Sequence, residues 1–133
     1  MRDIIVAMRV SFEWLKEFVD ITIGPNEAAD VLTMAGLEIE GIERLDGDVI
    51  FEVNVTPNRP DCLSVYGIAR ELSAALGIPL RFPENKLSEE DSDDGFRIEI
   101  LKPDLCHRYA GRVMKGVKVE QSPDWIKNRL TGC

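Results

Sequence analysis

The sequence predicts an α+β fold, in which a small helix–helix–hairpin–helix domain is followed by the beginning of a second α+β domain. Three observations support this fold class. Apolar residues first recur at helical spacing, then alternate with polar residues on either side of an Asp-Gly pair, and then return to helical spacing. An acidic stretch at residues 84–95 interrupts this pattern, and alternating apolar residues resume after it. A chain of 133 residues has room for such an arrangement.

Two amphipathic helices are expected at the start of the first domain. Ser11 is a good N-cap, and the apolar residues that follow it predict a helix over residues 12–19. A second helix opens at Gly24-Pro25, because proline is tolerated in the first turn. Gly36 is placed to end this helix in a left-handed conformation. Its predicted buried face consists of Ala28, Val31, Leu32 and Ala35.

A β-hairpin is predicted next. After Gly36 the apolar period changes from 3.6 to 2, which pairs residues 37–45 with residues 49–55. Asp46-Gly47 between them is a dipeptide that tolerates the positive φ angles of a tight hairpin turn. The order of two helices and a hairpin is winged-helix-like.

A rigid turn and a third helix complete the first domain. The two prolines of residues 56–61 exclude regular structure there. The helix is expected to begin at Asp61 or Ser64 and to end at Gly77, with an uninterrupted apolar stripe between.

The rest of the chain is predicted to be a linker and an incomplete domain. Residues 84–95 hold six acidic residues and one lysine, a composition typical of a linker. Strands are expected at 96–100 and 109–119, and a helix after Ser122-Pro123. The predicted organisation is an N-terminal extension at 1–7, a first domain at 8–83, a linker at 84–95 and the incomplete start of a following domain at 96–133.

Charge, hydropathy and cysteine content exclude several classes of protein. The net charge is −8, and residues 1–95 hold 8 basic and 20 acidic side chains against 8 and 4 in residues 96–133. This balance argues against a chain that coats nucleic acid non-specifically. No apolar run approaches the roughly 20 residues of a membrane span, and the start is too weakly basic for a signal peptide. We therefore expect a cytoplasmic protein without a membrane partner, in which Cys62, Cys106 and Cys133 are reduced thiols.

Three arginines are candidate contacts for the phosphates of a nucleic acid or for another protein chain. Arg59 lies in the turn, where the alternative is a structural role in which Arg59 and Asp61 are tied into the loop. Arg108 and Arg112 belong to a second basic group, for which solvated charge is the alternative. Arg70 and Glu71 are adjacent on a helix and are not expected to face each other.

Cys106 beside His107 invites comparison with a nucleophile and its base. Neighbouring residues of a strand point to opposite faces, so the pair is badly placed to share a proton. The sequence also lacks a Gly-rich phosphate loop, a paired acid dyad and a cluster with metal-ligand spacing. We expect no catalytic, cofactor-binding or metal-binding residues in this chain.

Four motifs resemble one known family. Residues 8–19 (MRVSFEWLKEFV) and 32–40 (LTMAGLEIE) are similar to its opening phrases. The most specific motif is 55–64 (VTPNRPDCLS), which continues into 67–72 (GIAREL). Residues 106–109, 116–119 and 122–125 resemble the start of the next domain of that family. On these motifs the chain resembles the N-terminal part of the bacterial phenylalanyl-tRNA synthetase β subunit over residues 8–130.

The resemblance implies a scaffold function. In that family an α2β2 enzyme synthesises Phe-tRNA; the α subunit uses ATP and magnesium, and the β subunit adds editing and tRNA binding. The implied partners of this chain are the α subunit and the rest of the β subunit, with tRNA indirectly. The family usually carries an inserted OB-fold tRNA-binding module where only residues 41–52 stand here. The editing site of the family lies beyond residue 133.

Two other functions are compatible with the sequence. The chain could be a freestanding nucleic-acid-binding or protein-interaction module derived from that domain, although the acidic first domain speaks against phosphate binding. It could also be a small hydrolase built on Cys106, which would require an unusually reactive thiol.

Overall fold

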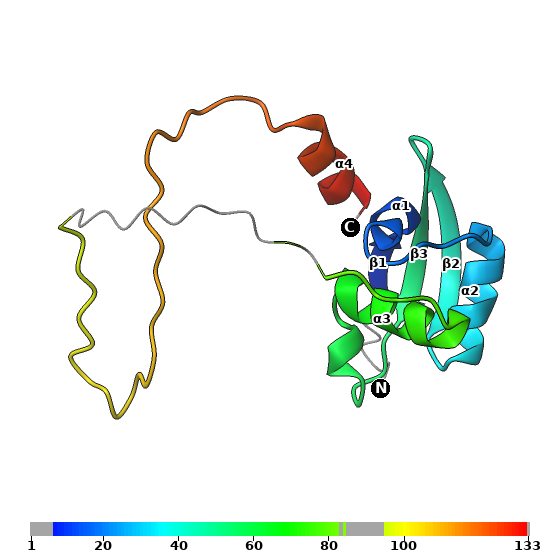
Figure 1. Cartoon of the computed structure of the whole chain (residues 1–133), viewed down its shortest axis with the longest axis horizontal. Helices are drawn as coiled ribbons and strands as arrows, with labels where there is room; N and C mark the ends of the chain where they lie inside the picture. Colours follow the sequence, from blue (N-terminus) through cyan, green and yellow to red (C-terminus); the bar gives the residue numbers. More distant parts are fainter. Residues whose placement is uncertain (1–6, 83, 85–94, 133) are drawn as a thin grey trace, which may run out of the picture. The chain divides into compact units, whose positions relative to one another are not determined.

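The structure is a computed structural model that describes residues 7–82, 84 and 95–132. Its contacts divide the chain into two units, Met1–Glu84 with Ser122–Cys133, and Asn85–Gln121. Figure 1 shows the elements of the described residues. In chain order they are β1 (Ala7–Ser11), α1 (Phe12–Lys16), α2 (Pro25–Met34), β2 (Glu38–Leu45), β3 (Asp48–Asn54), the 3-10 helix η1 (Pro60–Cys62), α3 (Val65–Leu76) and α4 (Asp124–Gly132). The small α+β fold predicted from the sequence is confirmed.

The three strands form an antiparallel sheet in the order β1-β3-β2. The predicted hairpin is its larger part, with β2 paired to β3. Asp46 and Gly47 have φ angles of 49° and 87°, so the turn has the positive φ values that this dipeptide tolerates. A register shift between Ile39 and Gly41 marks a bulge in β2. The bulge was not predicted.

Strand β1 is an element that the sequence did not indicate. Ala7 pairs with Asn54 and Ser11 pairs with Ile50, so β1 adds the third strand beside β3. Ala7, which the sequence predicts to lie in an N-terminal extension, therefore belongs to the sheet. A five-residue strand has too few residues to reveal a period, and its partner lies about forty positions away in the sequence.

Helix α1 is shorter than predicted. Ser11 is its N-cap, and the Ser11 hydroxyl accepts a hydrogen bond from the Trp14 amide at 3.0 Å. The helix ends at Lys16 instead of Val19, because Val19 forms an isolated antiparallel bridge with Leu80. The pairing of this segment with the chain that follows α3 replaces the last helical turn.

Helices α2 and α3 confirm the predicted segments. In α2, Ala28 and Leu32 are buried as expected, but Ala29 is buried in place of Ala35, which is exposed. Helix α3 begins after the N-cap Ser64 and ends at Gly77, whose φ of 66° is left-handed.

The core lies between one face of the sheet and the helices α1, α2 and α3 (Figure 1). The sheet contributes alternate residues of β3, such as Phe51 and Val53, as the predicted alternation requires. The largest fully buried side chains are Phe51, Leu15, Leu32, Leu37, Ile50, Ile68, Leu72, Val10, Val19, Val53 and Cys62.

The second unit contradicts the predicted strands. Within residues 95–121 the structure assigns no strand, and Ile98, Tyr109 and Val113 are exposed. An alternating segment needs a partner ladder and an apolar surface to cover its face. Residues 85–94 of the predicted linker lie outside the described residues. None of the helices in the described ranges is long and apolar enough to cross a membrane.

Candidate functional site in the turn before helix α3

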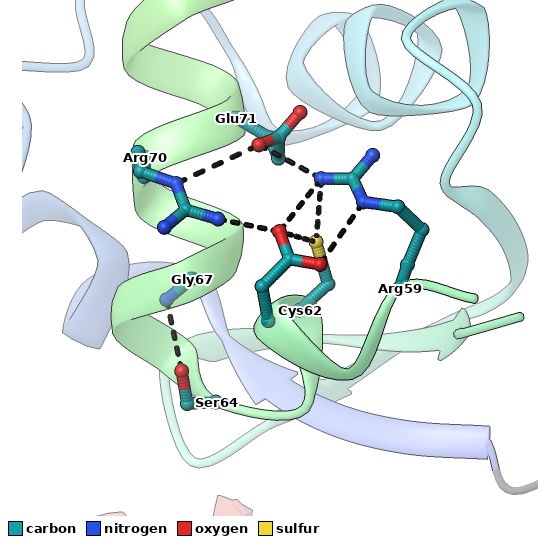
Figure 2. Close-up of polar contacts among 7 residues, drawn as sticks. Arg59, Cys62, Ser64, Gly67, Arg70 and Glu71 are labelled. Carbon is teal, nitrogen blue, oxygen red and sulfur yellow. Dashed lines mark hydrogen bonds and ion pairs between the residues drawn. The ribbon is translucent and has the colours of Figure 1, made fainter. Parts of the chain in front are cut away.

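The turn that precedes α3 is held by its own backbone. The Arg59 amide donates to the Thr56 carbonyl at 2.9 Å, and the Cys62 amide donates to the Arg59 carbonyl at 3.0 Å. The fixed φ angles of the prolines favour this compact path. Ser64 then starts α3 by accepting a hydrogen bond from the Gly67 amide at 3.0 Å (Figure 2). The turn therefore presents its side chains to the first two turns of α3.

The guanidinium group of Arg59 is the centre of a polar cluster. It donates two hydrogen bonds to Asp61, from Nε at 3.1 Å and from Nη2 at 3.0 Å. Nη2 also lies 2.8 Å from Oε1 of Glu71 and 3.0 Å from Sγ of Cys62. Figure 2 shows Glu71 and Cys62 converging on this guanidinium. The fork of Arg59 thus joins the turn to α3 through charge-assisted hydrogen bonds.

A second arginine completes the cluster. Nη2 of Arg70 donates a hydrogen bond to Asp61, so the Asp61 carboxylate accepts hydrogen bonds from two guanidinium groups. The Nε atom of Arg70 lies 3.7 Å from Oε1 of Glu71. The expectation that Arg70 and Glu71 do not face each other is wrong, because both long side chains reach around the helix to the turn. We refer to Arg59, Asp61, Cys62, Arg70 and Glu71 as the Arg59 cluster.

Three side chains of the cluster have shifted pKa values. Pairing shifts the pKa of Asp61 and of Arg59, and burial shifts that of Cys62. The hydrogen bond from Arg59 lowers the pKa of Asp61 to about 2. The same bond, followed by the one to Glu71, raises the pKa of Arg59. Burial raises the pKa of the Cys62 thiol to about 11, because the charged thiolate is disfavoured away from water. At neutral pH the cluster is an ion network around a neutral thiol.

Three side chains of the cluster could in principle hold a metal ion. One ligand atom each from Asp61, Cys62 and Glu71 lie within 4.8 Å of one another. However, Arg59 donates to all three atoms, so a guanidinium cation stands where the ion would bind. Magnesium also prefers oxygen ligands, and the Cys62 thiol is buried and protonated. The residues do not fit a metal site.

Gly67 allows the turn to approach α3. A Cβ atom at Gly67 would lie 1.9 Å from the carbonyl oxygen of Asp61, closer than any real contact. Sequence reasoning missed this residue, although a glycine inside a helical pattern costs about 1 kcal/mol relative to alanine and can therefore indicate a packing requirement.

The structure places the candidate residues in different units. Arg59 is in the Arg59 cluster with its side chain 28% exposed, whereas Arg108 and Arg112 are exposed residues of the second unit. Contact of these three arginines with tRNA or with a subunit stays a prediction. The Cys106 thiol points to the Arg108 carbonyl at 3.7 Å, and the structure gives no hydrogen bond between the described side chains of Cys106 and His107.

Comparison with known proteins identifies relatives along most of the chain. No family model matches it. A phenylalanine–tRNA ligase beta subunit from Rhodopirellula baltica is 42% identical over 125 residues, which are 92% of this chain and 18% of that protein. The subunit of the same name from Thermotoga maritima is 51% identical over 84 residues, which are 63% of this chain and 11% of that protein. The one from Anaeromyxobacter dehalogenans is 48% identical over 103 residues, with shares of 76% and 13%.

The chain is a relative of phenylalanine–tRNA ligase β subunits. It spans less than a fifth of the length of these curated relatives. The crystal structure of an N-terminal fragment of the phenylalanyl-tRNA synthetase β subunit from Pyrococcus horikoshii is 27% identical, with a TM-score of 0.49. That match covers 63% of this chain and 24% of the other. The identity to the three β subunits confirms the resemblance drawn from the sequence motifs. The residues of the Arg59 cluster lie in the most specific of those motifs, residues 55–64 and 67–72.

Proposed function

We propose that this chain is the N-terminal structural part of a phenylalanine–tRNA ligase β subunit. In this proposal it supports Phe-tRNA synthesis in an α2β2 enzyme and is not catalytic alone. The similarity to β subunits of that name over most of the chain carries the proposal. The Arg59 cluster supports a structural role, because its guanidinium and carboxylate groups form ion pairs with one another.

The proposed partners follow from the same relationship. They are the synthetase α subunit and the rest of the β subunit, with tRNA contacted indirectly, in the cytoplasm. ATP and magnesium belong in this proposal to the whole enzyme, and no cofactor is assigned to the residues of this chain.

We further propose the domain boundaries that the sequence suggests. Residues 8–83, together with Ala7 of β1, are a winged-helix-like first domain, and residues 84–95 are a linker. Residues 96–133 are the beginning of the domain that follows, of which helix α4 belongs to the same compact unit as the first domain. The helix–helix–hairpin–helix order supports the winged-helix comparison. The two-residue turn at Asp46-Gly47 supports the absence of an inserted OB-fold module between β2 and β3.

Among the candidate contacts, Arg108 fits a contact role better than Arg59. Arg59 has its donors directed at Asp61, Glu71 and Cys62, which supports the structural alternative for this residue. Arg108 is exposed, and we propose it together with Arg112 as part of a surface for tRNA or for a subunit.

A graft tests the proposed function directly. Residues 1–84 of this chain would replace the matching segment of the Rhodopirellula baltica β subunit, which is 42% identical over 125 residues that make up 92% of this chain. We expect the chimera to assemble with its α subunit and to form Phe-tRNA, as the unaltered β subunit does in parallel. A chimera that folds but does not assemble would overturn the proposal.

The isolated chain provides the complementary test. We expect it neither to form Phe-tRNA from ATP, phenylalanine and tRNA nor to release tyrosine from mischarged tRNA. Either activity would contradict a purely structural role. A salt-sensitive shift of tRNA or DNA in a gel would instead favour the freestanding nucleic-acid-binding module.

A further inference from the structure

One apolar side chain of the sheet is buried on the face opposite the core. Ile50 alternates with the core residues Val49 and Phe51 of β3, so its side chain points to the second face. Nevertheless it is only 1% exposed, and its neighbour in β1, Ser11, is 4% exposed. An element must therefore cover this end of the second face.

Helix α4 supplies that cover. Its last residue, Gly132, is buried, and a Cβ atom there would lie 2.9 Å from Cδ1 of Ile50 and 3.6 Å from Cβ of Ser11. The absence of a side chain lets the helix backbone rest directly on Ile50. Helix α4 and β1 belong to the same compact unit and contact each other.

Arg129 makes the second part of the contact. Its guanidinium carbon lies 4.8 Å from the ring centroid of Trp14 and 4.9 Å from that of Trp125, so it stands over both indoles. The same guanidinium forms an ion pair with Glu17, which follows α1. Cation–π contacts act at distances below about 6 Å, so both rings contribute.

The spacing of these residues gives α4 one contacting face. Trp125 and Arg129 are four positions apart, and Gly132 follows three positions later, which places all three on the same side of the helix. On the surface that α4 contacts, Trp14 of α1 and Glu17 at the end of α1 are three positions apart and so lie on one side of that helix. A cavity of about 320 Å³ lies between α4 and the surface that it contacts, and its lining residues include Trp14, Trp125 and Asp48.

We propose that Trp14, Glu17 and Ile50 form a docking surface whose occupant is the downstream helix α4 of the same chain. Charge and shape both select this occupant. Glu17 forms an ion pair with the guanidinium group of Arg129, and the rings of Trp14 and Trp125 both contact that group. Ile50 packs against the backbone of Gly132 at the end of α4. The region that follows the first domain is thereby tied to it at a defined place, which goes beyond the structural role proposed above.

Nuclear magnetic resonance of the whole chain tests this docking. We expect nuclear Overhauser contacts between the Ile50 δ-methyl group and the Gly132 α-protons, and between the Trp14 ring and Arg129. Arg129→Ala should weaken these contacts and move the indole N–H resonance of Trp14. Lys127→Ala is the matched control, because Lys127 pairs with Asp124 within α4 itself. It should leave the Trp14 resonance in place.

Two further readings make the test decisive. The methyl resonances of Ile68 and Leu72 in the core should be unchanged in Arg129→Ala, which separates loss of docking from unfolding. A Trp14 resonance at the same position in wild type and Arg129→Ala would overturn the proposal. Contacts that appear only between differently labelled chains would also overturn it, since the occupant would then be a second copy.

Discussion

At the scale of single residues, Arg59 and Asp61 decide how the turn before α3 is held. Asp61 accepts from two guanidinium groups, and Arg59 distributes its donors over the turn and the helix. The sequence placed Arg59 and Asp61 in one tied loop as an alternative, since an Arg-Pro-Asp turn needs hydrogen-bonded residues. It could not place Arg70 and Glu71 there, because the path of their side chains depends on where the turn lies against the helix.

The depressed pKa of Asp61 predicts a loss of stability in acid. Its folded-state pKa is about 2 against an ordinary 3.8, so the ionised form stabilises the fold above about pH 4, and this stabilisation is lost as the pH falls toward 2. Asp61→Asn should therefore lose less unfolding free energy than wild type between pH 4 and pH 2. Urea denaturation followed by tryptophan fluorescence at each pH measures this difference.

Arg59→Gln is the companion variant for this prediction. It removes the hydrogen bond that is the largest cause of the low pKa, so it should reduce the acid dependence in the same way. Parallel stability curves for wild type and Asp61→Asn would show that the carboxylate does not contribute as described.

At the scale of elements, local sequence signals were sufficient for most helices and for the hairpin. Ser64 and Gly77 delimit α3, and Asp46-Gly47 forms the turn of the hairpin, because caps and turns depend on the residues that make them. Strand β1 and the early end of α1 were missed. Both depend on pairing with segments far away in the sequence, which a local pattern does not contain.

The approach of η1 to α3 predicts an unusual effect of an alanine. In most helix positions Gly→Ala stabilises by about 1 kcal/mol. At Gly67 the added Cβ would meet the Asp61 carbonyl at 1.9 Å, so Gly67→Ala should instead destabilise by about 1–3 kcal/mol. Chemical denaturation monitored by circular dichroism measures the change.

The reverse substitution in the same helix calibrates this prediction. Ala75 is exposed in α3, and Ala75→Gly should lose about 1 kcal/mol through helix propensity alone. If Gly67→Ala were as stable as wild type, the close approach of turn and helix would be refuted.

At the scale of the whole molecule, one apolar core holds the first unit together. Leu72 of α3 is fully buried in it, whereas Leu63 next to the turn is 53% exposed. The described residues of the second unit carry many exposed apolar side chains, among them Leu101, Leu105 and Val117. Stability is therefore expected to reside in the first unit.

Paired leucine truncations test where the stability lies. Leu72→Ala should cost about 2–5 kcal/mol, because it removes buried methyl groups and leaves a cavity. Leu63→Ala should change stability by less than about 1 kcal/mol, because the side chain is half exposed. Thermal unfolding by calorimetry compares the two variants, and equal losses would mean that α3 does not face the core.

The sequence by itself indicated the similarity to phenylalanine–tRNA ligase β subunits, the α+β class and the elements whose signals are local. Apolar periodicity, capping residues and the Asp-Gly turn act within a few residues, so they can be recognised without the fold. Tertiary structure alone decided the third strand, the entry of Arg70 and Glu71 into the Arg59 cluster, and the need for Gly67. It also decided against strands at 96–100 and 109–119, since alternation makes a strand only where a partner offers hydrogen bonds and an apolar face. These features depend on which distant segments meet, and that is fixed only when the core closes.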